Sequence, residues 1–448
     1  MRKTNTILYL CSVKIKNPIL NLALPNILSN ISIPLVGMVD LALMGHMDSE
    51  LHLNAIAIGG SIFSFVYMSF GFLRMSTTGF VAQAHGRKNP VEELLIFSRS
   101  LLLAFSIALI LLLFQNPIGN LAVYLLGANE QVNSEALQYF HIRIFAAPAT
   151  LGLYAIVGWF IGRQDTRTPL LLALIINIGN VLFNLYFVYV LGLKSDGVAW
   201  GTLIAQYSGF LVGITILIAK SKRYWKESSL KALLNAQELK YFFNVNRDIF
   251  IRTVLLLLAL TFFTASSARM GEEILAVNTL LFQFFLFFTY FIDGFANAAE
   301  ALVGKHLGQN RYAGIKPLIT KIFIWGLVVS LPFSIVYFVF GTEILQMLTD
   351  IPSVIQASHP FMFWVGILPI LSFAAFIWDG VYIGATAAKA MRNSMVVATL
   401  LVYLPVYFLL EPFYGNHGLW VAFLAFLLSR GIYLHIISGK YIFTKSLS

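Results

Sequence analysis

Long apolar segments recur along the whole chain and are separated by short polar ones. Twelve stretches each hold about 20 mainly apolar residues, the length that an α-helix needs to cross a bilayer. Their centres lie near residues 30, 65, 105, 150, 180, 208, 258, 287, 330, 370, 403 and 427. Segments such as LLLAFSIALILLLF are apolar on all sides, whereas barrel strands would be half as long and alternate in polarity. The pattern predicts an all-α polytopic membrane protein with twelve transmembrane helices.

The composition agrees with this class, because 58% of the 448 residues are hydrophobic and 11% are charged, against about 25% charged residues in soluble domains. The first 14 residues, MRKTNTILYLCSVK, combine basic residues with a short apolar patch and no small-residue cleavage site. We therefore expect a retained cytoplasmic leader rather than a signal peptide. Cys11 is the only cysteine, which excludes an internal disulfide and a cysteine metal cluster.

Basic residues alternate from one loop to the next, as they do when Lys and Arg gather on the cytoplasmic side of a membrane. The basic segments hold Arg2, Lys3, Lys14 and Lys16; Arg87 and Lys88; Arg163 and Arg167; the stretch 220–247; Lys305, Arg311, Lys316 and Lys321; Lys389 and Arg392; Lys440 and Lys445. The loops between them hold Lys194 and Arg269 and most of the loop carboxylates. We therefore expect both termini in the cytoplasm and a multi-pass location in a plasma membrane, as in a bacterial inner membrane. The net charge of +10 is then a topogenic signal, and no nucleic-acid partner is expected.

The longest hydrophilic stretch, residues 219–248, follows the sixth span and divides the chain into similar halves. We predict an N-lobe of residues 1–218, a cytoplasmic linker of residues 219–248 and a C-lobe of residues 249–448. Motifs recur in the same order in both halves, and four glycines of the first half have counterparts in the second. The pairs are Gly71 and Gly294, Gly86 and Gly308, Gly162 and Gly384, and Gly197 and Gly418. Because six is an even number, the halves form two six-helix lobes related by a parallel repeat, an architecture common in secondary transporters.

Four carboxylates fall inside predicted spans, where a charge costs at least ~2.5 kcal/mol and usually faces a cavity or a partner. They are Asp40, Asp293, Glu300 and Asp379. For Asp40 the alternative is that it lies near the outer end of its helix and reaches water. Asp293 and Glu300 are two turns apart on one face. Embedded basic residues Arg74 and Arg143 could pair with these carboxylates or brace loops.

Two asparagines, Asn180 and Asn184, lie one helical turn apart on a later helix. Together with Asp40, on a helix that Pro25 and Pro34 allow to bend, they suit a proton or a small hard cation. The eight histidines form no HExxH or other metal-ligand spacing, and no GxxxxGK[ST] loop is present, so we expect neither an enzyme nor a metal site. A channel is a further alternative. It would need no alternating access, so a counterflow transport assay would distinguish it from a transporter.

Several long motifs resemble those of the multidrug and toxic compound extrusion (MATE) transporters, in their DinF-type branch. They include LALPNILSNISIPLVGMVDLALMGHM, FGFLRMSTTGFVAQAHGRKN, IDGFANAAEA and WDGVYIGATAAKAMRNSM. The resemblance runs nearly end to end. It implies two six-helix lobes around a central cavity and export of drugs or metabolites driven by inward flow of protons or sodium ions.

The resemblance also implies site residues. Asp40 matches the first-helix Asp of the branch, and the N-lobe polar cluster falls on Asn180, Asn184 and Thr202. Asp379 looks like the tenth-helix carboxylate of the C-lobe cation site in NorM-type relatives. Many DinF-type members have Asp where this chain has Asn184, and the seventh-helix Glu of NorM-type proteins has no match. A sodium site with two carboxylates is therefore in doubt.

We interpret the sequence as a secondary active antiporter that exports small organic compounds, cationic or amphipathic, by alternating access. The alternative is a flippase for lipids or lipid-linked sugars of the same superfamily, which would favour more basic residues in the cavity than Arg74 and Arg143. Asp293, Glu300 and Asp379 are expected to contact substrate or ion in the C-lobe. No cofactor is expected beyond a coupling proton or sodium ion, and the expected partners are a small-molecule substrate and the bilayer. The expected oligomeric state is a monomer.

Overall fold

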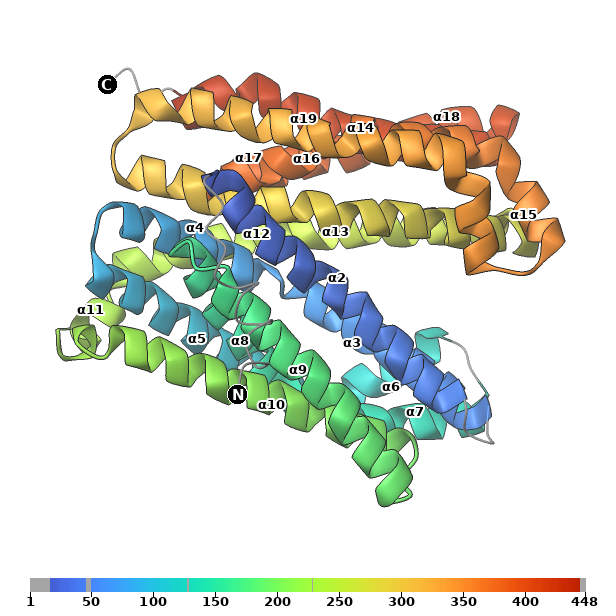
Figure 1. Cartoon of the computed structure of the whole chain (residues 1–448), viewed down its shortest axis with the longest axis horizontal. Coiled ribbons are helices and arrows are strands. Elements are labelled where there is room, and N and C mark those ends of the chain that lie inside the picture. Colours follow the sequence, from blue (N-terminus) through green and yellow to red (C-terminus); the bar gives the residue numbers. More distant parts are fainter. Residues whose placement is uncertain (1–16, 46–49, 127–128, 228, 444–448) are drawn as a thin grey trace, which may run out of the picture. The chain divides into compact units, whose positions relative to one another are not determined.

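The computed structural model describes residues 17–45, 50–126, 129–227 and 229–443 (Figure 1). The predicted leader and Cys11 lie outside the described residues. Within those ranges the chain is helical, with short turns and no strand, which confirms the all-α class. The first half contains α2 (Pro18–Gly45), α3 (Glu50–Ser69), α4 (Phe72–Gly86), α5 (Pro90–Leu113), α6 (Gln115–Leu126), α7 (Glu130–Arg143), α8 (Ala147–Gly162), α9 (Arg167–Leu185) and α10 (Ser195–Ser221).

The second half follows a short helix, α11 (Leu230–Leu233). It contains α12 (Ala236–Arg269), α13 (Glu272–Gly308), α14 (Ile315–Leu348), α15 (Pro352–Ser358), α16 (Met362–Gly384), α17 (Ala388–Val396), α18 (Leu404–Tyr414) and α19 (Asn416–Ser438). Among the described residues, 11 helical segments are long and apolar enough to cross a membrane. The 28-residue helix α2 precedes them. Each predicted span centre falls within α2 or one of these segments, so the predicted fold class is confirmed.

The chain forms two compact units, and their division crosses two helices. Residues 28–242 belong to the first unit, and residues 243–443 belong to the second together with the start of α2 up to Ile27. In the second unit the Ala23 carbonyl and the Ile27 side chain lie against Gly294 of α13. The division at Phe242 falls inside the predicted linker, in which α12 already begins at Ala236.

The two units repeat the same backbone details at a constant spacing in the sequence. Adding 222 to the number of Lys88 gives Asn310, and adding 222 to Gln164 gives Thr386; these four residues have positive φ angles of 57°, 55°, 64° and 52°. Non-glycine residues rarely adopt this conformation. The same spacing relates the turn bond from the Asn89 amide to the Ala84 carbonyl, 3.1 Å, to that from the Arg311 amide to the His306 carbonyl, 3.0 Å. This agreement supports duplication of one six-span unit.

Close helix contacts repeat with the same spacing. In the first unit, a Cβ atom on Gly158 of α8 would lie 2.7 Å from the Arg74 carbonyl of α4, and one on Gly162 would lie 2.8 Å from the Thr78 carbonyl. In the second unit, 222 residues later, a Cβ atom on Gly380 of α16 would overlap the Ala296 carbonyl of α13, and one on Gly384 would lie 2.6 Å from the Glu300 carbonyl. Glycine is required there because the two backbones touch. Figure 1 shows α13 and α16 running side by side in the second unit.

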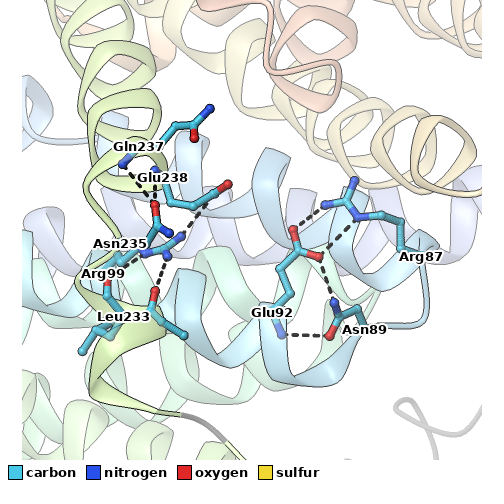
Figure 2. A network of polar contacts seen from close by, with 9 residues as sticks. Arg87, Asn89, Glu92, Arg99, Leu233, Asn235, Gln237 and Glu238 are labelled. Atoms are coloured by element: carbon cyan, nitrogen blue, oxygen red, sulfur yellow. Dashed lines mark hydrogen bonds and ion pairs between the residues drawn. The ribbon is translucent and has the colours of Figure 1, made fainter.

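Within the first unit, a buried arginine holds the start of α12 to α5. Arg99 donates hydrogen bonds to the Ala232 and Leu233 carbonyls at the end of α11, at 2.8 and 3.1 Å, and pairs with Glu238 at 3.6 Å (Figure 2). Asn235 caps α12 by accepting from the Gln237 and Glu238 amides. The last carbonyls of α11 have no amide partner in a following helical turn, and Arg99 supplies their hydrogen-bond donors instead.

Two further contacts brace loops of the first unit. Asn89 caps α5 by accepting from the Glu92 amide at 3.1 Å, and Arg87 pairs with the Glu92 carboxylate at 2.7 Å (Figure 2). Asp165, between α8 and α9, pairs with Lys220 at 2.5 Å. Burial would raise the pKa of the Asp165 carboxyl, but the bonds from Lys220 and from the Thr168 amide and hydroxyl outweigh it and lower the pKa. The ionised carboxylate therefore holds the loop to the end of α10.

Candidate functional site

Polar side chains follow one face of α9 in the first unit. Asn180 donates from Nδ2 to the Thr202 hydroxyl of α10 at 2.9 Å, and Asn184 donates from Nδ2 to Oδ1 of Asn180 at 3.2 Å. All three residues are at least nine-tenths buried. The Thr202 hydroxyl in turn donates to the Val198 carbonyl at 2.9 Å. The structure therefore brings together the three residues that the sequence analysis placed in the N-lobe polar cluster, and we call them the amide cluster.

A fourth side chain extends this face toward α2. Asn177, one turn before Asn180, donates from Nδ2 to the Ser32 carbonyl of α2 at 3.2 Å. The sequence analysis did not name Asn177, although its spacing of three residues from Asn180 and seven from Asn184 places all of them on one helix face. Since Ser32 lies on the helix that carries Asp40, the bond from Asn177 joins the amide cluster's helix to the backbone of α2.

Gly201 lets α10 approach the amide cluster. A Cβ atom at this position would overlap Oδ1 of Asn184 and lie 2.9 Å from the Asn184 backbone nitrogen. Any larger residue would push α10 away from α9 and part the bonded pair of Asn180 and Thr202. Asp40 itself belongs to α2, but its side chain lies outside the described residues, so its predicted place beside the amide cluster stays a prediction.

The second unit holds a buried ionic group of a different kind. Arg252 of α12 and Arg430 of α19 both donate from a terminal guanidinium nitrogen to Oδ2 of Asp379 on α16, the latter at 2.6 Å. The side chains are 6%, 2% and 10% exposed, in the order Arg252, Arg430 and Asp379. We call these residues the arginine–aspartate triad. Asp379 thus holds two built-in cations, so its charge is already balanced.

The other two carboxylates of the second unit lie on α13. Glu300 is fully buried and Asp293 is half-buried. Asp293 is near enough to act electrostatically on Arg430. The structure therefore places Asp293 in the neighbourhood of the triad, whereas Glu300 lies where α13 and α16 touch, since its carbonyl contacts Gly384.

The partners of Asp379 are arginines that the sequence analysis did not name. Arg252 occurs in NRDIFIRTVLL and Arg430 in LLSRGIYL, and an arginine inside an apolar run was the available signal. Arg143 instead donates to the Tyr139 hydroxyl at 2.6 Å and lies 4.8 Å from the centre of the Phe63 ring. These contacts fit the bracing alternative for Arg143. Arg74 is half-buried on α4.

Two duplicated six-span units, with charged and amide side chains buried inside their apolar helices, define a polytopic membrane transporter. The MatE family model matches residues 25–190 and 249–409. The chain belongs to the MatE family. It is therefore a transporter and not an enzyme.

Known relatives agree with this assignment. The DNA damage-inducible protein F of Escherichia coli (strain K12) is 36% identical over 417 residues, covering 93% of this chain and 90% of the relative. A crystal structure of MATE in the bent conformation superposes with a TM-score of 0.88 at 16% identity, covering 99% of each chain. An outward-facing multidrug resistance MATE family transporter of the MOP superfamily superposes with a TM-score of 0.84 at 16% identity over the full length of both chains. The latter two likenesses concern the fold.

Proposed function

We propose that this protein is a secondary active antiporter that exports small organic compounds by alternating access, driven by inward flow of protons. The observation that carries the proposal is the buried amide cluster on α9 and α10, next to the helix that bears Asp40, in a chain of the MatE family. One solved relative is described as a multidrug resistance transporter in an outward-facing conformation, which supports export of this kind.

A proton is the simpler coupling ion because the amide cluster is neutral. Asn184 occupies the position at which a second carboxylate would stand, and its Nδ2 is used to donate to Asn180. Sodium usually prefers more anionic oxygen than one carboxylate supplies. Reconstituted protein should therefore export fluorescent compounds under an imposed proton gradient. Export that needs a sodium gradient and ignores the proton gradient would overturn the choice of ion.

Replacing Asn184 by Asp tests the neutral character of the cluster. Only a protonated carboxyl can donate to Oδ1 of Asn180 as the amide does, so we expect export by Asn184→Asp to fall as pH rises. Each pH unit above the titration point of the new carboxyl lowers its protonated fraction about tenfold. The measurement is the export rate in proteoliposomes across a series of pH values. Asn184→Leu is the matched control, because it loses the hydrogen bond without adding a titrating group and should lower export equally at every pH.

The orientation in the bacterial inner membrane, with both termini in the cytoplasm, also belongs to the proposal. In a Cys11→Ser background, a cysteine at Glu130 or Asp350 should react with an impermeant maleimide on intact cells, and one at Lys226 should react only after permeabilisation. All three positions are exposed, so burial does not limit the reaction. The reverse pattern of labelling would invert the topology.

The flippase alternative gains one observation from the structure. It called for basic residues beyond Arg74 and Arg143, which are half-buried, and Arg252 and Arg430 are additional arginines that are buried. The flippase alternative is tested by adding dithionite to vesicles that contain fluorescent lipids, with and without the protein, and measuring how much of the fluorescence is protected. Loss of protection that depends on the protein would favour lipid movement.

A further inference from the structure

The arginine–aspartate triad contains more buried donors and more positive charge than its one carboxylate satisfies. Two guanidinium groups offer ten N–H donors, and each gives one bond to the same oxygen of Asp379. Nε of Arg252 is buried and donates to no acceptor among the described residues. With both arginines charged, these three residues by themselves carry a formal charge of +1. Asp293 acts electrostatically on Arg430 but, in the described ranges, forms no ion pair with either guanidinium.

Burying such a group is costly unless an anion or further acceptors complete it. An unsatisfied buried donor loses its bonds to water without replacement, and an unpaired buried charge costs more. The Phe376 and Phe426 rings, 5.9 and 5.4 Å from the Arg430 guanidinium, offset part of this cost for Arg430. They supply no hydrogen-bond acceptor for Arg252.

A purely structural brace accounts for the triad less well. An arginine that pairs with a carboxylate frequently forms two parallel bonds to both of its oxygens, whereas here two arginines share one oxygen. Asp293 influences Arg430 from a distance, but within the described part of the chain each guanidinium is within ion-pair distance of Asp379 alone. An added anionic group would therefore compete with Asp379 and with no other ion pair that the described residues form with these two arginines.

We propose that Arg252 and Arg430 bind the carboxylate, sulfonate or phosphate group of an anionic ligand, and that Asp379 is the resident counter-ion with which this ligand competes. The proposal rests on the proposed transport function and names its substrate class. It replaces the expectation of a cationic substrate at Asp379, because a cation bound here would lie against two guanidinium groups in a medium that strengthens charge repulsion.

Three naphthalene probes of similar shape and different charge test the site. The full-length protein in lipid nanodiscs is dialysed against 2-naphthoate, neutral 2-naphthylmethanol and cationic 2-naphthylmethylammonium. We expect naphthoate to bind more tightly than the other two. Asp379→Asn should lower the Kd for naphthoate by about tenfold, since it removes the competing anion, and Arg430→Gln should raise it by at least about tenfold. Arg99→Gln, which changes a buried arginine of the first unit, should leave the Kd unchanged.

If Asp379→Asn alone fails to fold, two variants that both lack the Arg252 charge can be compared instead. Arg252→Gln leaves the triad neutral, whereas Arg252→Gln with Asp379→Asn restores the charge of +1. The double variant should bind naphthoate more tightly than the single one. Weaker binding by the double variant, or tighter binding of the cationic probe by the unchanged protein, would overturn the anion site.

Transport assays separate the failure of this inference from the failure of the proposed function. Gradient-driven export of the cationic probe without naphthoate binding would support the antiporter function and contradict the anion site. If none of the three probes is exported under a proton gradient or a sodium gradient, the proposed antiporter function is contradicted. An anionic lipid headgroup has the same chemistry as naphthoate, so scrambling of fluorescent phosphatidylglycerol that Arg430→Gln abolishes would assign the site to a lipid.

Discussion

Asp40→Asn should abolish export driven by a proton gradient while leaving substrate binding measurable. A carboxyl that exchanges a proton during transport favours different conformations in its two charge states, and Asn holds the helix in the state that resembles the protonated one. Because Asn neither binds nor releases a proton, the imposed gradient should no longer raise export above the rate measured without a gradient. The measurement is export from proteoliposomes, with the Kd of the same substrate determined separately.

Asp350→Asn is the matched control for Asp40→Asn. Asp350 is exposed between α14 and α15, so the same chemical change there should leave export unaltered. Export by Asp40→Asn at the rate of the unchanged protein would mean that Asp40 is a solvated residue near the outer end of α2. Coupling would then have to involve Asp293, Glu300 or Asp379.

Gly380→Ala should remove most of the folded protein. The added Cβ atom would overlap the Ala296 carbonyl of α13, and a backbone atom cannot move aside as a flexible side chain can. Overpacking typically costs about 1–3 kcal/mol, and a backbone clash between two packed helices should reach the upper end or exceed it. We expect a large loss of monodisperse protein in size-exclusion chromatography and a lower Tm for the protein that remains.

The repeat supplies a second test of the same contact, and α3 supplies a control. Gly158→Ala, 222 positions earlier, should also destabilise the protein, because its Cβ atom would lie 2.7 Å from the Arg74 carbonyl. Gly60 has no atom within 4 Å of an added Cβ. Gly60→Ala should therefore be neutral, or stabilising by up to about 1 kcal/mol through better helix propensity. A normal Tm for Gly380→Ala would contradict the close packing of α13 on α16.

The amide cluster shows how far a family resemblance and helix periodicity lead. Asn180 and Asn184 were predicted to lie on one face, and the structure adds that they are bonded to each other and to Thr202. Asn177 has the same periodicity, but its acceptor is a backbone carbonyl on a helix 145 residues away. No sequence pattern marks one carbonyl of a helix as an acceptor, because every residue has one.

The triad shows the opposite case. Asp379 was selected because a carboxylate inside an apolar helix is costly, but the sequence does not say whether a substrate, an ion or another side chain balances it. Its partners lie 127 and 51 residues away on different helices. The expectation of a cationic ligand rested on the buried carboxylates and the family resemblance, whereas our proposal of an anionic ligand rests on the two guanidinium groups that donate to Asp379.

The sequence by itself determined the all-α class, the positions of the spans and the duplication, because the length of an apolar run and the order of loop glycines are local properties of the chain. Bilayer thickness converts run length directly into a helix that spans the membrane. Only the tertiary structure decided which buried polar groups meet. Ion pairs and hydrogen bonds act over a few ångströms between helices whose mutual packing depends on contacts such as those at Gly201 and Gly380. The charge of a buried site therefore follows from which helices touch, and no single helix carries that information.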